Sequence, residues 1–478
     1  MCKNKDFVKE YVLSGRDEIF ADLFDMIRLR SVFGDSSPEM PFGPGPAESL
    51  NFAVNLYRKH GWDVDLHADR GYAVVKVSSG PKRFGVFTHC DVVGENGRWA
   101  FGAPFEPSFY KGLIVGRGAK DDKGAVIASL YAIDALRAAG IQLKNDVFIY
   151  LGSNEESGMQ DLQNYLEDNG QPDLGLVPDC ENAICRGEKS LCGFYLNCTI
   201  PFENIIDFSG GDVPNAVIPE FSAVLPDLPD LRGQIEENLR GRTDASLSED
   251  AAGHLLLHTK GISTHAAAPE GSVNAAAVAA DILRRCSALG ANDTALMQYV
   301  YDMLKDYRGD FFNIAYEDSD FKMLTTISGV IKTVDGKLSI HQRCCYNTAV
   351  SYDWIERNVR AKVEPDGWQY VFEMDSTGVL YPFDDPYVSR LNQLYNETAD
   401  GPAQGIYTTR GGTYARMLKY AFACGIDAPK TVFPPEYTLG QGKPHQPDEC
   451  IGADNLIGGI ALLALYIAEM DNILAGTN

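Results

Sequence analysis

A histidine and a carboxylate close an apolar segment early in the chain. The run that begins at Phe84 ends in His89, Cys90 and Asp91. Because side chains alternate along a strand, His89 and Asp91 point to the same face of the predicted sheet. An imidazole with a carboxylate beside it is a metal ligand together with the group that orients it. Taken alone, a histidine on a strand is more often an ordinary buried residue.

Two adjacent carboxylates, Asp121 and Asp122, follow a glycine-rich turn and precede an Ala-rich segment, 124–139, which we predict to be helical. An N-cap for that helix would explain one aspartate but not both. The Gly116-x-Gly118 pattern is not a dinucleotide-binding fingerprint, because Asp121 stands where the third glycine is needed and would place negative charge against a pyrophosphate. Asp121 is therefore a candidate metal ligand.

Further candidates follow two other predicted strands and a proline-rich loop. Glu155 and Glu156 come shortly after the apolar strand 147–151, Asp179 follows another short strand, and His445 lies between prolines. Open α/β sheets bind their ligands at the carboxyl ends of strands. Each residue taken singly also has an ordinary explanation as a surface or loop side chain.

Together these residues form a ligand set for two metal ions. The set contains two imidazoles and three carboxylates: His89, Asp121, Glu156, Asp179 and His445. Such N/O donors suit Zn²⁺ first, with Mn²⁺ or Co²⁺ as alternatives. Metal pairs about 3.5 to 4 Å apart activate water and polarise a carbonyl together, and two ions that share a carboxylate would need about five protein ligands. Glu155 would then be free to take the proton from that water.

The strings that contain these residues resemble the M20 family of dinuclear metallopeptidases, and are most similar to its PepV-like dipeptidase branch. The strings are His89-Cys-Asp91, Gly116-Arg-Gly-x-x-Asp121-Asp122-Lys-Gly, Asn154-Glu155-Glu156-Ser-Gly, Pro178-Asp179, Gly411-Gly-Thr-Tyr-Ala-Arg416 and His445-Gln-Pro-Asp-Glu. They lie in the family's order over nearly the whole chain.

The resemblance implies a role for each candidate ligand. Asp121 would bridge the two ions. His89 and Asp179 would complete one metal site, and Glu156 and His445 would complete the other.

The resemblance also implies three features beside the ligands. The peptide bond between Asp121 and Asp122 would be cis, Asp91 would orient His89, and Glu155 would be the general base and later the proton donor to the leaving amine.

An inserted lid domain follows from the same resemblance. Within the segment 264–274, His265 would help to hold the oxyanion of the tetrahedral intermediate, and Asn215 would support the same site. A histidine in a loop before a helix is the ordinary alternative for His265.

Substrate-binding residues are expected near the end of this insert and beyond it. Arg343 aligns with an arginine that grips the substrate's terminal carboxylate, although Cys344 and Cys345 replace the Tyr-Pro that usually follows in the family. Gly411 and Gly412 would permit close approach of the backbone to the substrate.

The fold class predicted is α/β: a catalytic domain with a mostly parallel sheet flanked by helices, interrupted by an inserted α+β lid domain. The chain's 478 residues exceed two ordinary domains. Helical and short apolar segments alternate up to about residue 190, and the pattern changes after Cys192. In this later part we predict one long Ala-rich helix over residues 273–289. We expect residues 1–191 and 385–478 to form the catalytic domain and residues 192–384 to form the lid.

Net charge and composition limit the classes of molecule that the protein is expected to bind. The chain has 42 Lys+Arg against 66 Asp+Glu, a formal net charge of −24, which disfavours nucleic acid and anionic membranes. We see no export signal, and the apolar stretch Leu456 to Met470 reads as a buried helix. The eleven cysteines never form Cys-x-x-Cys. We expect a cytoplasmic monomer or homodimer that acts on small peptides.

The predicted function is a metal-dependent dipeptidase that hydrolyses short peptides with a free C-terminal carboxylate. An amidohydrolase that deacylates N-acyl amino acids has the same metal motifs and remains the alternative. A metal-binding protein without catalysis is disfavoured by the intact Glu155. The sequence contains no Gly-x-Ser-x-Gly, His-Glu-x-x-His or phosphate-binding Gly-x-x-x-x-Gly-Lys-[Ser/Thr] motif.

Overall fold

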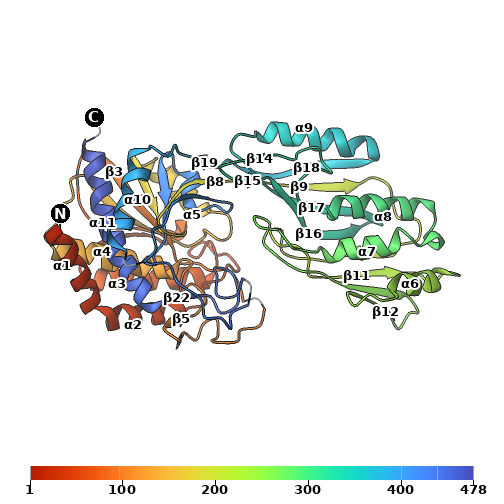
Figure 1. Cartoon of the computed structure of the whole chain (residues 1–478), viewed down its shortest axis with the longest axis horizontal. Coiled ribbons are helices and arrows are strands. Elements are labelled where there is room, and N and C mark those ends of the chain that lie inside the picture. Colours follow the sequence, from red (N-terminus) through yellow and green to blue (C-terminus); the bar gives the residue numbers. More distant parts are fainter. Residues whose placement is uncertain (1, 96, 400, 439, 477–478) are drawn as a thin grey trace. The chain divides into compact units, whose positions relative to one another are not determined.

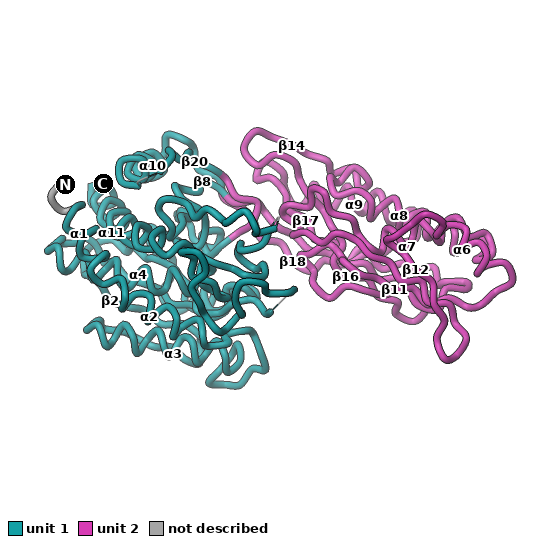
Figure 2. Tube along the Cα trace, turned by 60° about the horizontal axis from the view of Figure 1, so that its bottom comes forward, with its two compact units in different colours: residues 1–187, 380–407, 413–478 teal, residues 188–379, 408–412 magenta. Residues whose placement is uncertain are grey.

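The chain forms two compact units in a computed structural model that describes residues 2–95, 97–399, 401–438 and 440–476 (Figure 2). Unit 1 comprises Met1–Gly187, Leu380–Tyr407 and Thr413–Asn478, and unit 2 comprises Glu188–Val379 and Thr408–Gly412. The sequence placed the two main boundaries at residues 192 and 384, and it did not anticipate that 408–412 joins unit 2. That short segment is held there by hydrogen bonds, such as the one from the backbone N–H of Lys189 to the carbonyl of Thr409 (3.2 Å).

Unit 1 is built from helices around one large sheet (Figure 1). Its helices are α1 (Cys2–Ser14), α2 (Arg16–Ile27), α3 (Pro44–Lys59), α4 (Lys123–Ala138), α5 (Gln160–Asn169), α10 (Pro386–Thr398) and α11 (Ala453–Gly476). Its strands, with those that cross its boundaries, are β1 (Asp63–His67), β2 (Tyr72–Lys76), β3 (Arg83–His89), β4 (Ser108–Tyr110), β5 (Leu113–Val115), β6 (Asp146–Gly152), β7 (Leu174–Val177), β8 (Ile184–Glu188), β19 (Val379–Leu380), β20 (Ile406–Thr409), β21 (Ala421–Ala423) and β22 (Cys450–Gly452).

The large sheet is parallel only at its centre. Its strand order is β1-β2-β6-β3-β7-β21-β8-β19, with β20 paired to β8. Strands β6, β3, β7 and β21 run parallel, whereas β2 joins β6 and β8 joins β21 in antiparallel pairs. The mostly parallel sheet that we predicted is therefore a mixed one. The apolar runs of β3, β6 and β7 reflect burial on both faces, which marks the central strands and not the outer ones.

Helices α4 and α11 pack against each other in the unit 1 core and lie side by side (Figure 1). All fourteen residues from Lys123 to Leu136 are buried. The predicted buried helix at the C-terminus is confirmed, and it is longer than expected. By length and composition alone α11 could span a membrane, but 72% of its most apolar window is buried inside the structure, as in a core helix.

Unit 2 has the α+β composition expected for the insert. Its helices are α6 (Leu231–Leu239), α7 (Ala275–Leu283), α8 (Ala291–Leu304) and α9 (Tyr352–Val363). Its strands are β9 (Ser190–Cys198), β10 (Asp207–Ser209), β11 (Glu220–Leu225), β12 (Ala245–Glu249), β13 (Leu255–Lys260), β14 (Glu317–Asp318), β15 (Lys322–Met323), β16 (Thr325–Val334), β17 (Lys337–Tyr346) and β18 (Trp368–Ser376).

Two antiparallel sheets share one core in unit 2. Their strand orders are β16-β17-β9-β18 and β10-β11-β13-β12. The long helix predicted over 273–289 is shorter in the structure. Helix α7 begins after Asn274, whose side chain accepts the N–H of Ala276, and it ends at Leu283, while Ser287–Leu289 forms a separate 3₁₀ turn before Gly290 (φ 87°).

Candidate functional site

Three of the predicted site segments meet at one edge of the unit 1 sheet. His89 is the last residue of β3, the pair Glu155-Glu156 follows β6, and Asp179 follows β7. Strand β3 is parallel to both neighbours, and His89 is in register with Gly152 of β6. The carboxyl ends of all three strands therefore point the same way, which brings these side chains together.

The five predicted ligands form two groups that share Asp121. In one group, His89 Nε2 lies 3.2 Å from Asp121 Oδ1 and 3.6 Å from Asp179 Oδ2. In the other, His445 Nε2 lies 3.0 Å from Asp121 Oδ2 and 3.0 Å from Glu156 Oε1. The donor atoms of each group lie within 4.8 Å of one another. Asp121 thus offers one oxygen to each group, as a bridging ligand would.

The chemistry of these groups fits two divalent cations. His89 Nε2 and Glu156 Oε1 are buried, and each faces another of the candidate ligands. Burial raises the pKa of Asp179 to about 7, with Asp121 adding to the rise. Burial also raises the pKa of Glu155. Crowded carboxylates in a dry site are costly to keep ionised, and bound cations remove that cost.

Asp91 positions both a ligand and the adjacent loop. His89 Nδ1 lies 3.0 Å from the carbonyl of Asp91 and 3.3 Å from its Oδ1. Both partners are acceptors, so Nδ1 carries the proton and the lone pair of Nε2 faces the shared Asp121. The Asp91 carboxylate also accepts the backbone N–H groups of Glu155 and Glu156, each at 3.1 Å. This second task was not anticipated from the sequence.

The expected cis peptide bond between Asp121 and Asp122 is present. Asp122 occupies the N-cap position of α4, but its side chain makes no capping hydrogen bond. Its Oδ2 accepts the backbone N–H of His89 instead, at 3.1 Å. The capping explanation for this aspartate therefore fails, and its side chain ties α4 to the end of β3.

A buried ion pair that the sequence analysis missed holds the main chain of Asp121. Glu449 Oε1 accepts the backbone N–H groups of Gly118 (3.0 Å), Lys120 (3.2 Å) and Asp121 (3.1 Å). Glu449 Oε2 accepts a hydrogen bond from Arg117 Nη1 at 2.6 Å, and both side chains are fully buried. Each residue lies in one of the motif strings, but their pairing across 332 positions leaves no local signal.

In unit 2, Asn215 and His265 lie on two segments that pair with each other. The backbone N–H of Ala266 donates to the carbonyl of Asn215 (2.8 Å), and both predicted side chains are exposed. The backbone N–H of Ala267 donates to His265 Nδ1 at 3.1 Å. Because Nδ1 accepts this hydrogen bond, the ring proton of neutral His265 resides on Nε2.

Arg343 lies within β17 with its guanidinium beside another charged side chain. Its Nη2 lies 3.6 Å from Glu373 Oε2, and its Nη1 lies 2.7 Å from the sulfur of Met374. His341 Nε2 approaches the same Glu373 oxygen at 2.9 Å. Gly193 on β9 faces Arg343, and a Cβ there would lie 2.0 Å from the Glu373 carboxylate and 2.9 Å from the guanidinium. Arg343 is thus buried and already partly neutralised.

The two predicted glycines lie beside an arginine that the sequence analysis did not single out. Gly411 and Gly412 are half-buried, and a Cβ on Gly411 would meet only Thr409 Oγ1, at 3.8 Å. Packing therefore does not require glycine at position 411. Arg410 forms an ion pair with Glu270 and reaches the carbonyl of Ala267 at 3.3 Å, so it supports the loop that carries His265.

Comparison with known proteins supports a peptidase. The model of "Peptidase family M20/M25/M40" matches residues 85–469. "Putative dipeptidase YtjP" of Bacillus subtilis is 28% identical over 477 residues, covering 96% of this chain and 98% of that protein. A "Putative dipeptidase" of Staphylococcus epidermidis is 28% identical over 487 residues, with the same coverages of 96% and 98%.

Solved structures share the fold at lower sequence identity. Human carnosine dipeptidase 1 superposes with a TM-score of 0.59 at 15% identity, over 98% of this chain and 100% of that one. The dipeptidase Dug1p of Saccharomyces cerevisiae gives a TM-score of 0.60 at 13% identity, over 99% of each chain. Because the family model covers residues 85–469, including the ligand groups that share Asp121, this chain belongs to peptidase family M20/M25/M40.

Proposed function

We propose that this protein is a metal-dependent dipeptidase that hydrolyses short peptides with a free C-terminal carboxylate. The observation that carries the proposal is the pair of ligand groups joined through Asp121. The full-length relatives named as dipeptidases favour this substrate class over longer peptides. Two divalent ions, Zn²⁺ first, would lower the pKa of a bound water and polarise the scissile carbonyl.

Glu155 is the general base of the proposed reaction. Its Oε1 is buried without a hydrogen-bond partner in the described chain, and Asp91 fixes its backbone N–H. A carboxylate that is fixed at the main chain and unpaired at its tip can accept a proton from the attacking water. The same carboxyl then returns the proton to the leaving amine, so Glu155 is regenerated in each cycle.

We assign substrate contacts to residues of unit 2. His265 carries its proton on Nε2 and can donate it in a hydrogen bond to the developing oxyanion, with Asn215 supporting the same site. Arg343 grips the terminal carboxylate of the substrate, a role that its planar guanidinium suits because it can donate two parallel hydrogen bonds to a carboxylate. Gly411 and Gly412 leave the backbone accessible to the substrate.

We further propose a cytoplasmic location. None of the ten described cysteines forms a disulfide, and all of them except Cys180 are buried. Cysteines without disulfides in such numbers are usual in a reducing compartment.

Hydrolysis of matched substrates tests the proposal. Metal-stripped protein is assayed with and without Zn²⁺ or Mn²⁺ on dipeptides with a free amino group, such as Ala-Ala and β-Ala-His, and on N-acetyl amino acids. We expect metal-restored cleavage of the dipeptides. Cleavage of the acetylated set alone would assign a deacylase, and cleavage of neither set with metal bound would refute the dipeptidase.

A further inference from the structure

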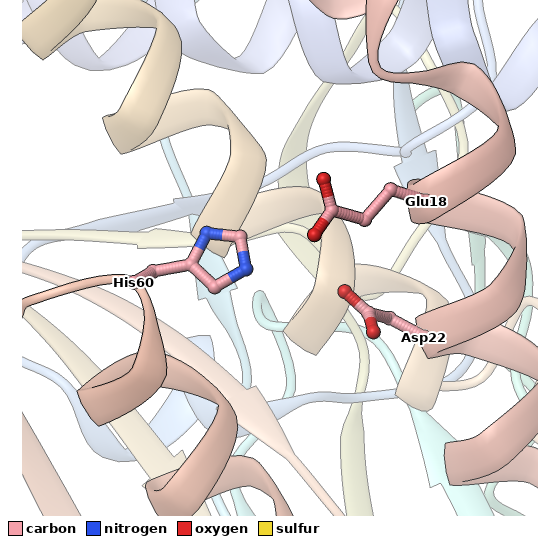
Figure 3. Close-up of side chains that lie close together, drawn as sticks. All are labelled: Glu18, Asp22 and His60. Atoms are coloured by element: carbon pink, nitrogen blue, oxygen red, sulfur yellow. The ribbon is translucent and has the colours of Figure 1, made fainter.

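A second group of possible metal ligands lies in unit 1, outside every motif string (Figure 3). Glu18 and Asp22 lie one turn apart on α2, so their side chains share a face of the helix. His60 is the residue that follows α3. The donor atoms of these three side chains lie within 4.8 Å of one another.

A carboxylate behind His60 fixes its orientation. His60 Nδ1 lies 2.5 Å from Asp134 Oδ2. The other oxygen of Asp134 accepts hydrogen bonds from Trp62 Nε1 (2.9 Å) and Arg137 Nη2 (2.6 Å), so this carboxylate is held in place and presents an acceptor oxygen to His60. Nδ1 is therefore the protonated nitrogen, and Nε2 points toward the two carboxylates of α2 (Figure 3). Metal-binding histidines are commonly oriented by such a carboxylate.

The Asp22 carboxylate supplies an independent reason to expect a cation. Its side chain is 8% exposed, and its only hydrogen bond in the described chain is the one that Oδ2 accepts from the Tyr131 hydroxyl (2.6 Å). The Asp22 carboxyl group faces the space that it shares with His60 (Figure 3). A carboxylate that is largely buried keeps its charge at a cost, and a cation in that space would reduce the cost.

The formal charges of the side chains around His60 favour a bound cation. Glu18, Asp22 and Asp134 contribute three negative charges. The neighbouring cations are Lys59, whose Nζ lies 3.8 Å from Glu18, and Arg137, which already pairs with Asp134. One negative charge remains uncompensated while His60 is neutral.

We propose that Glu18, Asp22 and His60 bind a divalent transition-metal ion, with Zn²⁺ as the first candidate. One imidazole and two carboxylates are donors that Zn²⁺ accepts, at about 2.0 to 2.2 Å, and a further position remains for water. The Glu18 side chain is 56% exposed, so it can rotate to close the donor distances around an ion held by the two more buried ligands. The bound ion would fasten α2 to the end of α3. Two of its ligands would also be hydrogen-bonded to α4, through Asp134 and Tyr131. Helix α4 begins directly after the Asp121-Asp122 bond.

Equilibrium dialysis of the metal-loaded enzyme against buffered Zn²⁺ tests the site. We expect the wild-type protein to bind one more ion per chain than Glu18→Gln and His60→Gln. Asp134→Asn should weaken that ion at least about tenfold, because it removes only the orienting partner. Zn²⁺ should also raise the melting temperature of the wild-type holoenzyme more than that of the variants.

A matched control variant distinguishes binding at this site from nonspecific binding of metal to the protein surface. His254 also lies beside a carboxylate, Asp250 at 3.0 Å, but belongs to no group of three ligands among the described residues. His254→Gln should keep the additional ion. Glu18→Gln changes an exposed side chain, so its folding is not in question, and every catalytic ligand stays in place. Equal metal content in wild type and Glu18→Gln would overturn the proposal, and so would loss of the ion in His254→Gln.

Discussion

The buried pair of Arg117 and Glu449 allows a quantitative test of how Asp121 is held. Glu449 is fully buried and accepts four hydrogen bonds. One comes from Arg117, and three come from the backbone N–H groups of Gly118, Lys120 and Asp121. The substitution Glu449→Gln keeps the size of the side chain and removes its charge. Its amide oxygen can still face the backbone groups, but its NH₂ group then faces the guanidinium, donor against donor.

The expected cost follows from the stranded charge. Removing one partner of a buried ion pair costs about 3 to 5 kcal/mol, because the remaining charge stays desolvated. That is a large share of the roughly 5 to 15 kcal/mol that holds an ordinary domain together. Adding Arg117→Met removes the stranded charge, so the double variant should be more stable than Glu449→Gln alone. The two substitutions should deviate from additivity by at least about 1 kcal/mol.

Urea unfolding and metal content provide the assay. Because Glu449 supports the main chain of Asp121, we expect Glu449→Gln to bind catalytic metal about 10 to 100 times more weakly. The matched control is Glu95→Gln, which breaks an exposed pair with Arg30 (2.7 Å) and should cost at most about 1 kcal/mol. A cost for Glu449→Gln no larger than that of Glu95→Gln, with full metal affinity, would refute the reasoning.

Three other predictions concern single side chains. Glu155→Gln should keep its metal and lose at least about 10²-fold in turnover, as for removal of a general base, and near-normal turnover would exclude that role. Arg343→Ala should raise KM for free dipeptides much more than for dipeptide amides, whereas an equal rise for both would exclude the carboxylate grip. Burial raises the pKa of Asp161 to about 6, so the folded state holds this proton more tightly than the unfolded chain and stability falls as pH rises toward 6. In urea unfolding, wild type should therefore lose about 1 kcal/mol relative to Asp161→Asn between pH 5 and pH 7.5, and a constant difference would contradict the assigned pKa.

The candidate metal ligands of unit 1 could be predicted from the sequence because each has a recognisable local setting. His89, Glu156 and Asp179 lie at or shortly after the ends of apolar strands, and parallel strands deliver their carboxyl ends to one edge. These three residues could therefore be grouped from the sequence, and the parallel pairing of β3 with β6 and β7 brings them to one edge. The C-terminal helix was also predictable from the sequence, because an apolar stretch of that length is usually a helix buried in the core.

Other features depended on contacts between distant segments. The outer strands reverse the parallel pairing of the centre, which the apolar patterns do not encode. The helix predicted over 273–289 ends early at Leu283, and residues 408–412 join unit 2 although they lie within the catalytic part of the sequence.

The tertiary structure also decided which polar side chains act together. Arg117 and Glu449 meet across 332 positions, and His60 meets Asp134 across 74. A lone charged residue carries no mark of its partner in the sequence, since pairing depends on how helices and loops stack in three dimensions. Local periodicity fixes which face a side chain occupies, and only the packed chain fixes what that face meets.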